Sequence, residues 1–202
     1  MQINKNLNIL EVGPGLGVNL QTLNKYGEVD ILEIDAYFVD QIQKNYKNIN
    51  HFSSLEQINK NYDLIVMLDV LEHIEDTHIF LKKINEILAE KGSLILSVPA
   101  YQKLFSEHDI EMQHFRRYST KLLKNTLNEF FMIQDILRYN SFLLPLRVLQ
   151  IIFFKNINSE VGINNFINVI FKKIINFEVW LNKKRIRIPF GLSIFCIAKK
   201  TT

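Results

Sequence analysis

The segment NILEVGPGLGVNLQTLNKYGEVDILEID, residues 8–35, decides the expected fold of this chain. Its apolar residues predict strands over Leu7–Val12 and Val29–Glu33, with a helix over about Val18–Lys25 between them. The first strand runs into three glycines: Gly13, Gly15 and Gly17. Glycine lets a ligand approach the main chain where a Cβ would clash, and the Glu33 carboxylate can accept hydrogen bonds from both hydroxyls of a ribose. The segment therefore predicts a pocket for a nucleoside with a small polar tail.

The spacing of these glycines distinguishes between two kinds of nucleotide site. A dinucleotide fingerprint, G-x-G-x-x-G, needs a glycine at its sixth position, which is Val18 here. The chain has E-x-G-x-G-x-G instead, beginning at Glu11. This pattern resembles motif I of the class I S-adenosylmethionine (SAM) dependent methyltransferases. The resemblance implies SAM as cofactor, bound by Glu11, the three glycines and a group of further residues: Glu33, Ile34, Leu55 and Asp69.

The remainder of the chain alternates strand patterns with helical patterns, which is typical of a doubly wound, mostly parallel sheet. We therefore expect an α/β chain with the Rossmann-like class I methyltransferase fold: seven strands, helices on both faces and one domain over residues 1–202. Further strands are predicted over residues 49–52, 64–68, 94–98, 132–137 and 194–199. Asp35 and Ser119 are predicted to cap the N-termini of helices, and Gly92 is predicted to end a helix.

Residues 140–189, between the last two predicted strands, are expected to form a helical insertion. Apolar residues recur there at helical spacing: Ile163, Phe166, Ile167, Ile170, Phe171, Ile174 and Leu181. Such a stripe indicates either packing against the sheet or a surface for an acceptor or a membrane. At its other end the chain begins almost at the first strand, without the N-terminal helix that usually closes over the cofactor in this family.

Composition limits the class of protein. Hydrophobic residues make up 48% and charged residues 22% of the 202 residues, which is ordinary for a globular domain. The N-terminus lacks the apolar core of a signal peptide, and the apolar run over residues 142–154 is shorter than the roughly 20 residues of a membrane span. The single cysteine, Cys196, predicts a core residue rather than a disulfide. These features indicate a cytoplasmic protein.

The net charge of +3 is divided unevenly along the chain. Residues 1–137 carry 13 Lys and Arg against 19 Asp and Glu, whereas residues 138–202 carry 11 against 2. The basic residues of the second part lie among aromatic and aliphatic ones, which favours peripheral contact with an anionic lipid surface or a phosphorylated acceptor. The alternative is a solvated helix face. No aromatic stacking motif is present, so nucleic acid is not an expected partner.

A second group of polar residues follows the predicted strand over residues 64–68: Asp69, Glu72 and His73. Ligands of parallel sheets bind outside the carboxyl ends of the strands, so Asp69 and His73 are expected to face the cofactor cleft. Imidazole titrates near neutrality and can remove a proton from an acceptor hydroxyl. A helix-terminal histidine bonded to the main chain is the alternative. The three residues also match the types that bind a divalent ion in ubiquinone-type O-methyltransferases.

A third group follows the next strand, at the mouth of the same cleft. It comprises Tyr101, His108, His114, Arg116, Arg117 and Tyr118. His108 is predicted as a second candidate base, and the others as substrate contacts. Arg116 and Arg117 can pair with a phosphate or carboxylate of the substrate; alternatively, Arg117 braces the loop against an acid such as Glu107. With the late Pro189–Ser193 segment, PFGLS, this pattern resembles methyltransferases of bacterial cell-surface glycan clusters.

The sequence therefore predicts a SAM-dependent methyltransferase acting on an oxygen of a small molecule, a sugar or a lipid-linked precursor. A non-catalytic, methyltransferase-like SAM-binding domain is the first alternative. An NAD-dependent oxidoreductase is the second, and Val18 together with Glu11 disfavours it.

Overall fold

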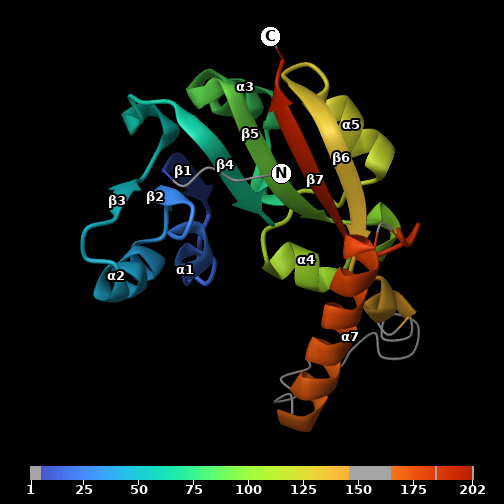
Figure 1. Ribbon diagram of the computed structural model, residues 1–202. Coiled ribbons are helices and arrows are strands. Elements are labelled where there is room, and N and C mark those ends of the chain that lie inside the picture. Colours follow the sequence, from blue (N-terminus) through green and yellow to red (C-terminus); the bar gives the residue numbers. More distant parts are fainter. Residues whose placement is uncertain (1–5, 146–164, 185, 202) are drawn as a thin grey trace.

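The protein is built on one seven-stranded sheet, seen in a computed structural model that describes residues 6–145, 165–184 and 186–201 (Figure 1). The strand order is β3-β2-β1-β4-β5-β7-β6. All pairings are parallel except those of β7, which runs antiparallel to both β5 and β6. The strands are β1 Leu7–Val12, β2 Gly27–Leu32, β3 Asn50–Phe52, β4 Tyr62–Leu68, β5 Leu88–Pro99, β6 Phe131–Tyr139 and β7 Ser193–Lys200. The predicted Rossmann-like methyltransferase fold is confirmed.

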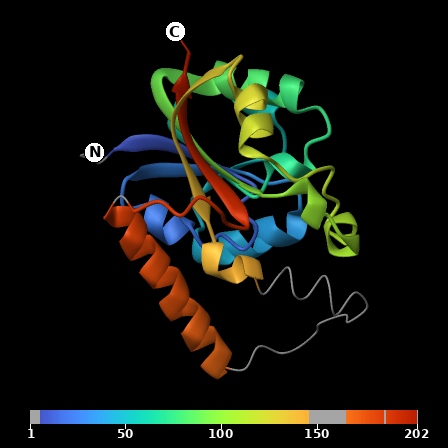
Figure 2. The same cartoon turned by 90° about the vertical axis from the view of Figure 1, so that its right-hand side faces the viewer.

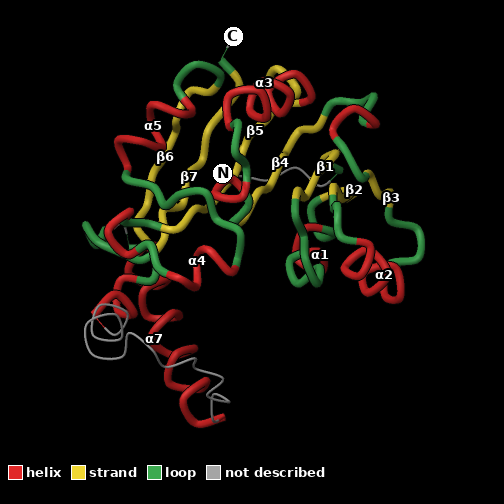
Figure 3. The backbone as a smooth tube through the Cα atoms, turned by 180° about the vertical axis from the view of Figure 1, so that it is seen from behind, coloured by secondary structure: helices red, strands yellow, loops and turns green. Residues whose placement is uncertain are grey.

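Helices cover both faces of this sheet because successive strand residues point to opposite sides. On β1, Ile9 packs with the core beneath α1 and α2, whereas Leu10 packs with the core beneath α3 and α5. Figure 3 shows α1 and α2 beside β1–β3, and α5 beside β6. The helices are α1 Leu20–Leu23, α2 Ala36–Asn45, α3 Thr77–Ile87, α4 Glu107–Glu111, α5 Thr120–Leu127 and α7 Asn165–Lys183. Short 3-10 helices span Leu55–Gln57, Leu71–His73, Gln102–Leu104 and Ser141–Leu143.

Two predicted helix caps are confirmed. The Asp35 carboxylate accepts a hydrogen bond from the Tyr37 amide at 2.8 Å, and the Ser119 hydroxyl accepts one from the Leu122 amide at 3.0 Å. The prediction for Gly92 is wrong, because α3 ends at Ile87 and the chain enters β5 directly at Leu88. Gly92 lies inside β5, where an added Cβ would come within 2.8 Å of the Leu88 side chain.

The helix after the glycine turn is shorter than predicted. It begins only at Leu20, because Gly17 has a φ of +72° and the chain continues in turns up to that residue. Cys196 on β7 is wholly buried, as predicted for a core residue, and burial raises the pKa of its thiol to about 12. Among the described residues, no helix combines the length and the apolar character that crossing a bilayer requires.

Helix α7 belongs to the predicted insertion between β6 and β7. Figures 1 and 2 show it leaving the sheet edge and projecting away from the body, rather than lying across a face of the sheet. Its anchor is Glu178, which is 1% exposed and accepts hydrogen bonds from the Ser141 amide at 3.1 Å and the Ser141 hydroxyl at 2.7 Å. Of the predicted apolar stripe, Ile174 and Leu181 are half-buried; residues 146–164 lie outside the described residues.

Candidate active site

The glycine turn and Glu33 meet at the carboxyl ends of β1 and β2, which pair in parallel with Val12 beside Leu32. The Gly15 amide donates to Glu33 Oε2 at 3.2 Å, and the Asp35 amide donates to Glu33 Oε1 at 3.0 Å. The structure thus brings together the two features that the sequence singled out 18 residues apart. We call the carboxyl ends of β1, β2 and β4, with residues 13–17, Glu33 and Asp69, the cofactor edge.

Gly15 and Gly17 serve different purposes, although both have a positive φ, of +53° and +72°. An added Cβ at Gly15 would meet no atom within 4 Å. A Cβ at Gly17 would lie 2.8 Å from Leu20 Cδ1 and 3.0 Å from Ile42 Cγ1. Gly17 therefore allows the turn to pack on α1 and α2, whereas Gly15 keeps the space beside Glu33 open to a ligand.

Glu11 lies beneath this turn on β1 with 2% of its surface exposed. Its Oε1 accepts a hydrogen bond from Asn19 Nδ2 at 2.9 Å, whereas its Oε2 is buried without a partner in the described part of the chain. Burial raises the pKa of Glu11, although the hydrogen bond from Asn19 opposes this shift. A buried carboxylate oxygen without a donor fits the cationic α-amino group of SAM.

Exposed apolar side chains follow β1 and β2 at the cofactor edge. Ile34, which directly follows Glu33, is 85% exposed, and Leu16 and Tyr37 are 63% and 62% exposed. Exposed apolar side chains at strand ends and in turns suit the flat face of an adenine ring. Of these three residues, only Ile34 is predicted from the sequence, although Leu16 and Tyr37 also lie outside the core pattern. The predicted Leu55 is half-buried and packs against the core.

Asp69 follows β4 in an uncommon backbone conformation, with a φ of +54°. Its carboxylate accepts a hydrogen bond from the Ser97 hydroxyl at 3.0 Å, and its amide donates to the Ser97 carbonyl at 3.1 Å. Residues other than glycine that adopt a left-handed backbone conformation are often found at functional sites. The exposed Asp69 is thus held at the point where β4 and β5 both end, next to the predicted acceptor residues.

Three side chains form what we call the histidine cluster: Glu72, His73 and His114. The rings of His73 and His114 pack edge to face with centroids 4.6 Å apart, and one ligand atom from each of the three residues lies within 4.8 Å of the others. Burial raises the pKa of Glu72 to about 8. Burial and the neighbouring His114 lower the pKa of His73, which favours the uncharged form of this imidazole.

The histidine cluster suits a divalent ion in its residue types and spacing. It shares Glu72 and His73 with the set predicted from sequence, but its third member is His114, from a segment 41 residues further along the chain. Glu72 Oε2 is buried without a hydrogen-bond partner among the described residues, so a cation could satisfy it. Asp69, the third member of the predicted set, is bonded to Ser97 instead.

Asp109, which the sequence analysis missed, holds the acceptor loop, our name for residues 99–119. Its buried carboxylate accepts hydrogen bonds from the Ser106 amide and hydroxyl, His114 Nδ1 and Arg117 Nε, at 2.9, 3.0, 3.0 and 2.7 Å. Burial alone would raise the pKa of Asp109, but the donors from Arg117, His114 and Ser106 lower it below its usual value. The S-x-x-D spacing of a capping box was the available signal.

Two predicted substrate contacts turn inward. Arg117 braces the acceptor loop, and its acidic partner is Asp109 rather than Glu107, because Glu107 on the same short helix is exposed. Tyr118 is wholly buried, pairs with Ala100 in an isolated bridge, and donates from its hydroxyl to the Leu71 carbonyl at 3.3 Å. Both residues therefore shape the loop instead of lining an open cleft.

The other predicted residues of the acceptor loop lie nearer its surface. His108 is exposed on α4, 4.0 Å from Glu111. Arg116 Nη2 donates to the Glu75 carbonyl at 2.7 Å. Tyr101 lies two residues after the end of β5. It has a φ of +64° and is half-buried. The His114 side chain is 13% exposed, far less than the 64% of His108.

Comparisons with known proteins identify the family and the fold. A family model described as a methyltransferase domain matches residues 2–138. The ubiquinone biosynthesis O-methyltransferase of Rickettsia bellii (strain OSU 85-389) is 31% identical over 100 residues, which cover 45% of this chain. The match covers 41% of that enzyme, so it extends over less than half of the relative's length.

Solved structures give the same fold. A SAM-dependent methyltransferase from Mesorhizobium loti has a TM-score of 0.65 at 11% identity, covering 98% of this chain and 93% of that one. N-methyltransferase NodS from Bradyrhizobium japonicum WM9, in complex with S-adenosyl-L-homocysteine, has a TM-score of 0.55 at 16% identity, covering 67% and 71% of the two chains. Similarity at these identities shows the fold alone.

Proposed function

The chain belongs to the class I SAM-dependent methyltransferases, and from this premise we propose that it methylates an oxygen atom of a small-molecule, sugar or lipid-linked acceptor. The observation that carries the proposal is the pairing of His114 with Asp109 at 3.0 Å, with the His73 ring packed 4.6 Å from that of His114. An oxygen acceptor must lose its hydroxyl proton as the methyl group arrives, and imidazole accepts protons at neutral pH.

Bound SAM would supply a methyl group on a positively charged sulfur, a good leaving group. An imidazole of the histidine cluster would take the hydroxyl proton that the acceptor oxygen loses as it receives this methyl group. The protein's main contribution to such a displacement is orientation of the two reactants, which can lower a barrier by roughly 7–11 kcal/mol. We assign the cofactor edge to the cofactor and the acceptor loop to the acceptor.

Each cofactor-edge residue has a role that its surroundings support. Glu33 would accept hydrogen bonds from the ribose hydroxyls, since its carboxylate already lies against Gly15. Glu11 would face the α-amino group through its unpartnered oxygen. The exposed side chains of Ile34, Leu16 and Tyr37 would contact the adenine.

We propose that His114 or His73, rather than His108, takes the hydroxyl proton of the acceptor. With its ring proton on Nδ1, His114 donates to Asp109 at 3.0 Å, which leaves the lone pair of Nε2 available. A carboxylate that orients an imidazole in this way also stabilises the imidazolium that forms when the ring takes a proton. His108 is exposed, and the Glu111 carboxylate beside it lies 4.0 Å from Nδ1, too far for an orienting hydrogen bond.

Calorimetric titration with S-adenosylhomocysteine tests the cofactor half of this proposal. We expect Glu33→Ala to weaken binding by about 100-fold or more, because charged hydrogen bonds contribute about 1.5–3 kcal/mol each. Glu28→Ala, an exposed acid at the other end of β2, is the matched control and should bind as the unaltered protein does. Equal affinities of the Glu33→Ala and Glu28→Ala variants would remove Glu33 from the site.

A second role for the histidine cluster is binding of a divalent ion, favoured by the 4.8 Å grouping of its ligand atoms. The two roles exclude each other, since a metal-bound imidazole nitrogen cannot accept a proton. Titration calorimetry with zinc and magnesium chlorides separates them. Binding that is lost in Glu72→Ala but retained in Glu75→Ala would support the ion, because Glu75 is an exposed acid three residues away.

We further propose that α7 brings the protein to an anionic membrane surface. Phe177 and Trp180 stack at 5.8 Å, Phe142 lies 6.0 Å from Phe177, and these three rings are 51%, 51% and 41% exposed. The same helix carries exposed lysines: Lys172, Lys173 and Lys183. Exposed aromatic rings with nearby cations suit the interface of a bilayer that contains anionic lipids. This surface would place a lipid-linked acceptor near the acceptor loop.

A further inference from the structure

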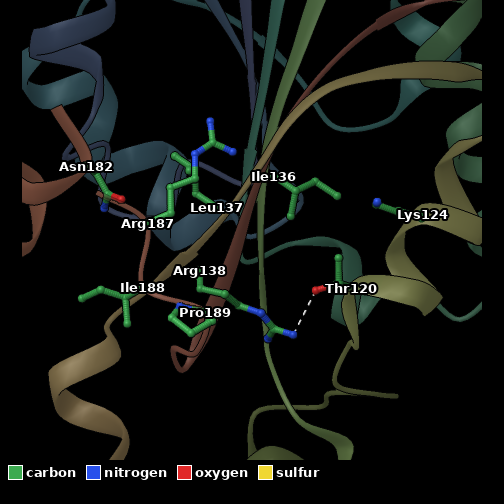
Figure 4. A pocket seen from close by; sticks show the side chains of 9 residues that line it. All are labelled: Thr120, Lys124, Ile136, Leu137, Arg138, Asn182, Arg187, Ile188 and Pro189. Atoms are coloured by element: carbon green, nitrogen blue, oxygen red, sulfur yellow. Dashed lines mark hydrogen bonds between the residues drawn. The ribbon is translucent and has the colours of Figure 1, made fainter. Parts of the chain in front are cut away.

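A cavity of about 320 Å³ lies at the edge of the sheet formed by β6, three strands away from the β4 end of the cofactor edge. Its size is at the lower end of the roughly 300–1,000 Å³ that is typical of small-molecule sites. α5, β6, the end of α7 and the segment after it line the cavity (Figure 4) with Thr120, Lys124, Ile136, Leu137, Arg138, Asn182, Arg187, Ile188 and Pro189.

The charged side chains that line this cavity are all basic. The positive charge of Arg187 is balanced by Asp135. The two terminal nitrogens of Arg187 contact the Asp135 carboxylate at 2.7 and 2.9 Å. Lys124 and Arg138 have no carboxylate partner within the described ranges. The cavity therefore keeps two positive charges, which come from α5 and β6, without an acid to balance them.

Arg138 is held in place by neutral groups. Its Nη2 donates to the Thr120 hydroxyl at 2.9 Å, as the dashed line in Figure 4 shows, and its guanidinium lies 5.0 Å from the centre of the Tyr101 ring. Its Nη1 is buried and has no hydrogen-bond partner in the described part of the protein. A buried donor on a charged group is costly to leave unpaired, so this nitrogen is suited to an anionic oxygen from a ligand.

The pairing of the strands places one residue of the cavity lining close to the start of the acceptor loop. β6 runs in the same direction as β5, and Pro99 on β5 and Tyr139 on β6 both pair with Ser193 on β7. Arg138 and the start of the acceptor loop therefore both lie at the carboxyl ends of the strands. The Arg138 guanidinium contacts Tyr101 of that loop. Arg138 thus connects the lining of the cavity with the loop.

We propose that this cavity binds a phosphate group of the methyl acceptor through Lys124 and Arg138. The inference deepens the proposed function and rests on it for the identity of the ligand as the acceptor. A planar guanidinium and a flexible ammonium are the usual partners of phosphate oxygens. The Thr120 hydroxyl and the Asn182 amide add neutral donors to the same lining.

Calorimetry of the whole chain with sodium pyrophosphate at low ionic strength tests the site. We expect one binding site, with affinity weakened at least about tenfold in Lys124→Gln and in Arg138→Gln. Lys121→Gln is the matched control, because Lys121 is exposed on the same helix but does not line the cavity. Lys124 is itself exposed, so its substitution leaves the fold intact even if that of Arg138 does not.

No binding by the unaltered protein, or an equal loss in Lys121→Gln, would overturn the proposal. S-adenosylhomocysteine titrations of the same proteins separate this failure from that of the proposed function. All of them should bind S-adenosylhomocysteine equally, because Glu33 and the glycine turn are unchanged. If the unaltered protein binds pyrophosphate but not S-adenosylhomocysteine, the proposed function fails and the anion site stands without its assignment to an acceptor.

The source of the phosphate is identified by a competition experiment. Vesicles of phosphatidylcholine with and without phosphatidic acid are sedimented with the protein, in the presence and absence of pyrophosphate. Displacement by pyrophosphate, together with weaker sedimentation of Lys124→Gln than of Lys121→Gln, would identify a lipid headgroup. Sedimentation that neither pyrophosphate nor Lys124→Gln changes would identify a phosphorylated acceptor in solution.

Discussion

Two buried carboxylates at the same edge of the sheet have opposite surroundings. Glu11, beneath the cofactor edge, has one hydrogen-bond donor and an oxygen without a partner among the described residues, and its pKa is raised. Asp109, within the acceptor loop, accepts from four donors, and its pKa is lowered. Glu11 therefore weakens the isolated fold, whereas Asp109 strengthens it.

The difference shows how each region is built for its ligand. The cofactor edge has main-chain groups and an incompletely paired acid, Glu11. These polar groups are available for hydrogen bonds to a ligand. The acceptor loop instead uses its acid to fix its own side chains, His114 among them, before any acceptor arrives. A site whose groups are held in place needs less ordering during the reaction.

The largest effect is expected from removing the anchor of the acceptor loop. Asp109→Ala should lower the free energy of unfolding by about 3–5 kcal/mol, because it leaves the nearly buried Arg117 guanidinium without its counter-charge. Urea denaturation measures this change. Glu111→Ala, on the same helix but with a 72% exposed side chain, should stay within about 0.5 kcal/mol of the unaltered protein. A loss below about 1 kcal/mol in Asp109→Ala would refute the anchoring role.

Asp109 also shows which parts of the site could be predicted from the sequence and which could not. The glycine turn and Glu33 could be predicted because a strand, a turn and the next strand are consecutive in the chain, and parallel pairing aligns their ends. Asp109 and Glu107 are two residues apart on a five-residue helix, and only the packing of that helix decides which acid is buried. The one local signal is the S-x-x-D capping-box spacing from Ser106, which favours Asp109 but does not predict its burial.

The histidine cluster illustrates the same limit. Glu72 and His73 are neighbours in the sequence, and their position after β4 predicted a shared site. His114 joins them because the Phe115 amide donates to the Glu72 carbonyl at 2.8 Å, a contact between segments more than 40 residues apart. Such a contact depends on the complete fold, so the sequence assigned His114 to the substrate alone.

The second prediction separates folding from binding within the cofactor edge. Gly17→Ala should lower the free energy of unfolding by about 2–4 kcal/mol, because a positive φ is strained for alanine and its Cβ would overlap Leu20. Gly15→Ala should cost only about 1–2 kcal/mol, from the positive φ alone, yet weaken S-adenosylhomocysteine binding at least about tenfold. Denaturation and calorimetry of both variants measure these effects. Unchanged affinity in Gly15→Ala would show that the space beside Glu33 is not the binding site.

The third prediction concerns the pH dependence caused by Glu11. Its pKa is raised in the folded state, so between the ordinary value of 4.5 and the raised one the unfolded chain has lost a proton that the folded chain retains. Stability due to this group therefore falls as pH rises through that interval. Glu11→Gln should remove the fall and make the protein more stable than the unaltered one at pH 7, while weakening S-adenosylhomocysteine binding.

Urea titrations from pH 4 to pH 8 measure this difference. Asp109 provides the opposite case in the same protein: its lowered pKa means that its stabilisation is present above the ordinary value of 3.8 and lost as pH falls through the folded value. If Glu11→Gln were less stable than the unaltered protein at pH 7, the carboxylate would be paired in solution and its role toward a cationic ligand would be excluded.

The smallest change in stability is expected on α7, outside both regions compared above. Trp180→Ala should alter the free energy of unfolding by no more than about 0.5 kcal/mol, because the ring is half exposed and Glu178, not Trp180, anchors the helix. Its sedimentation with anionic vesicles should nevertheless fall about tenfold in affinity, equivalent to about 1.4 kcal/mol. Ile79→Ala, a 56% exposed apolar side chain on α3, is the control. Equal sedimentation of the two variants would mean that the aromatic face of α7 does not meet the membrane, and that the acceptor reaches the loop from solution.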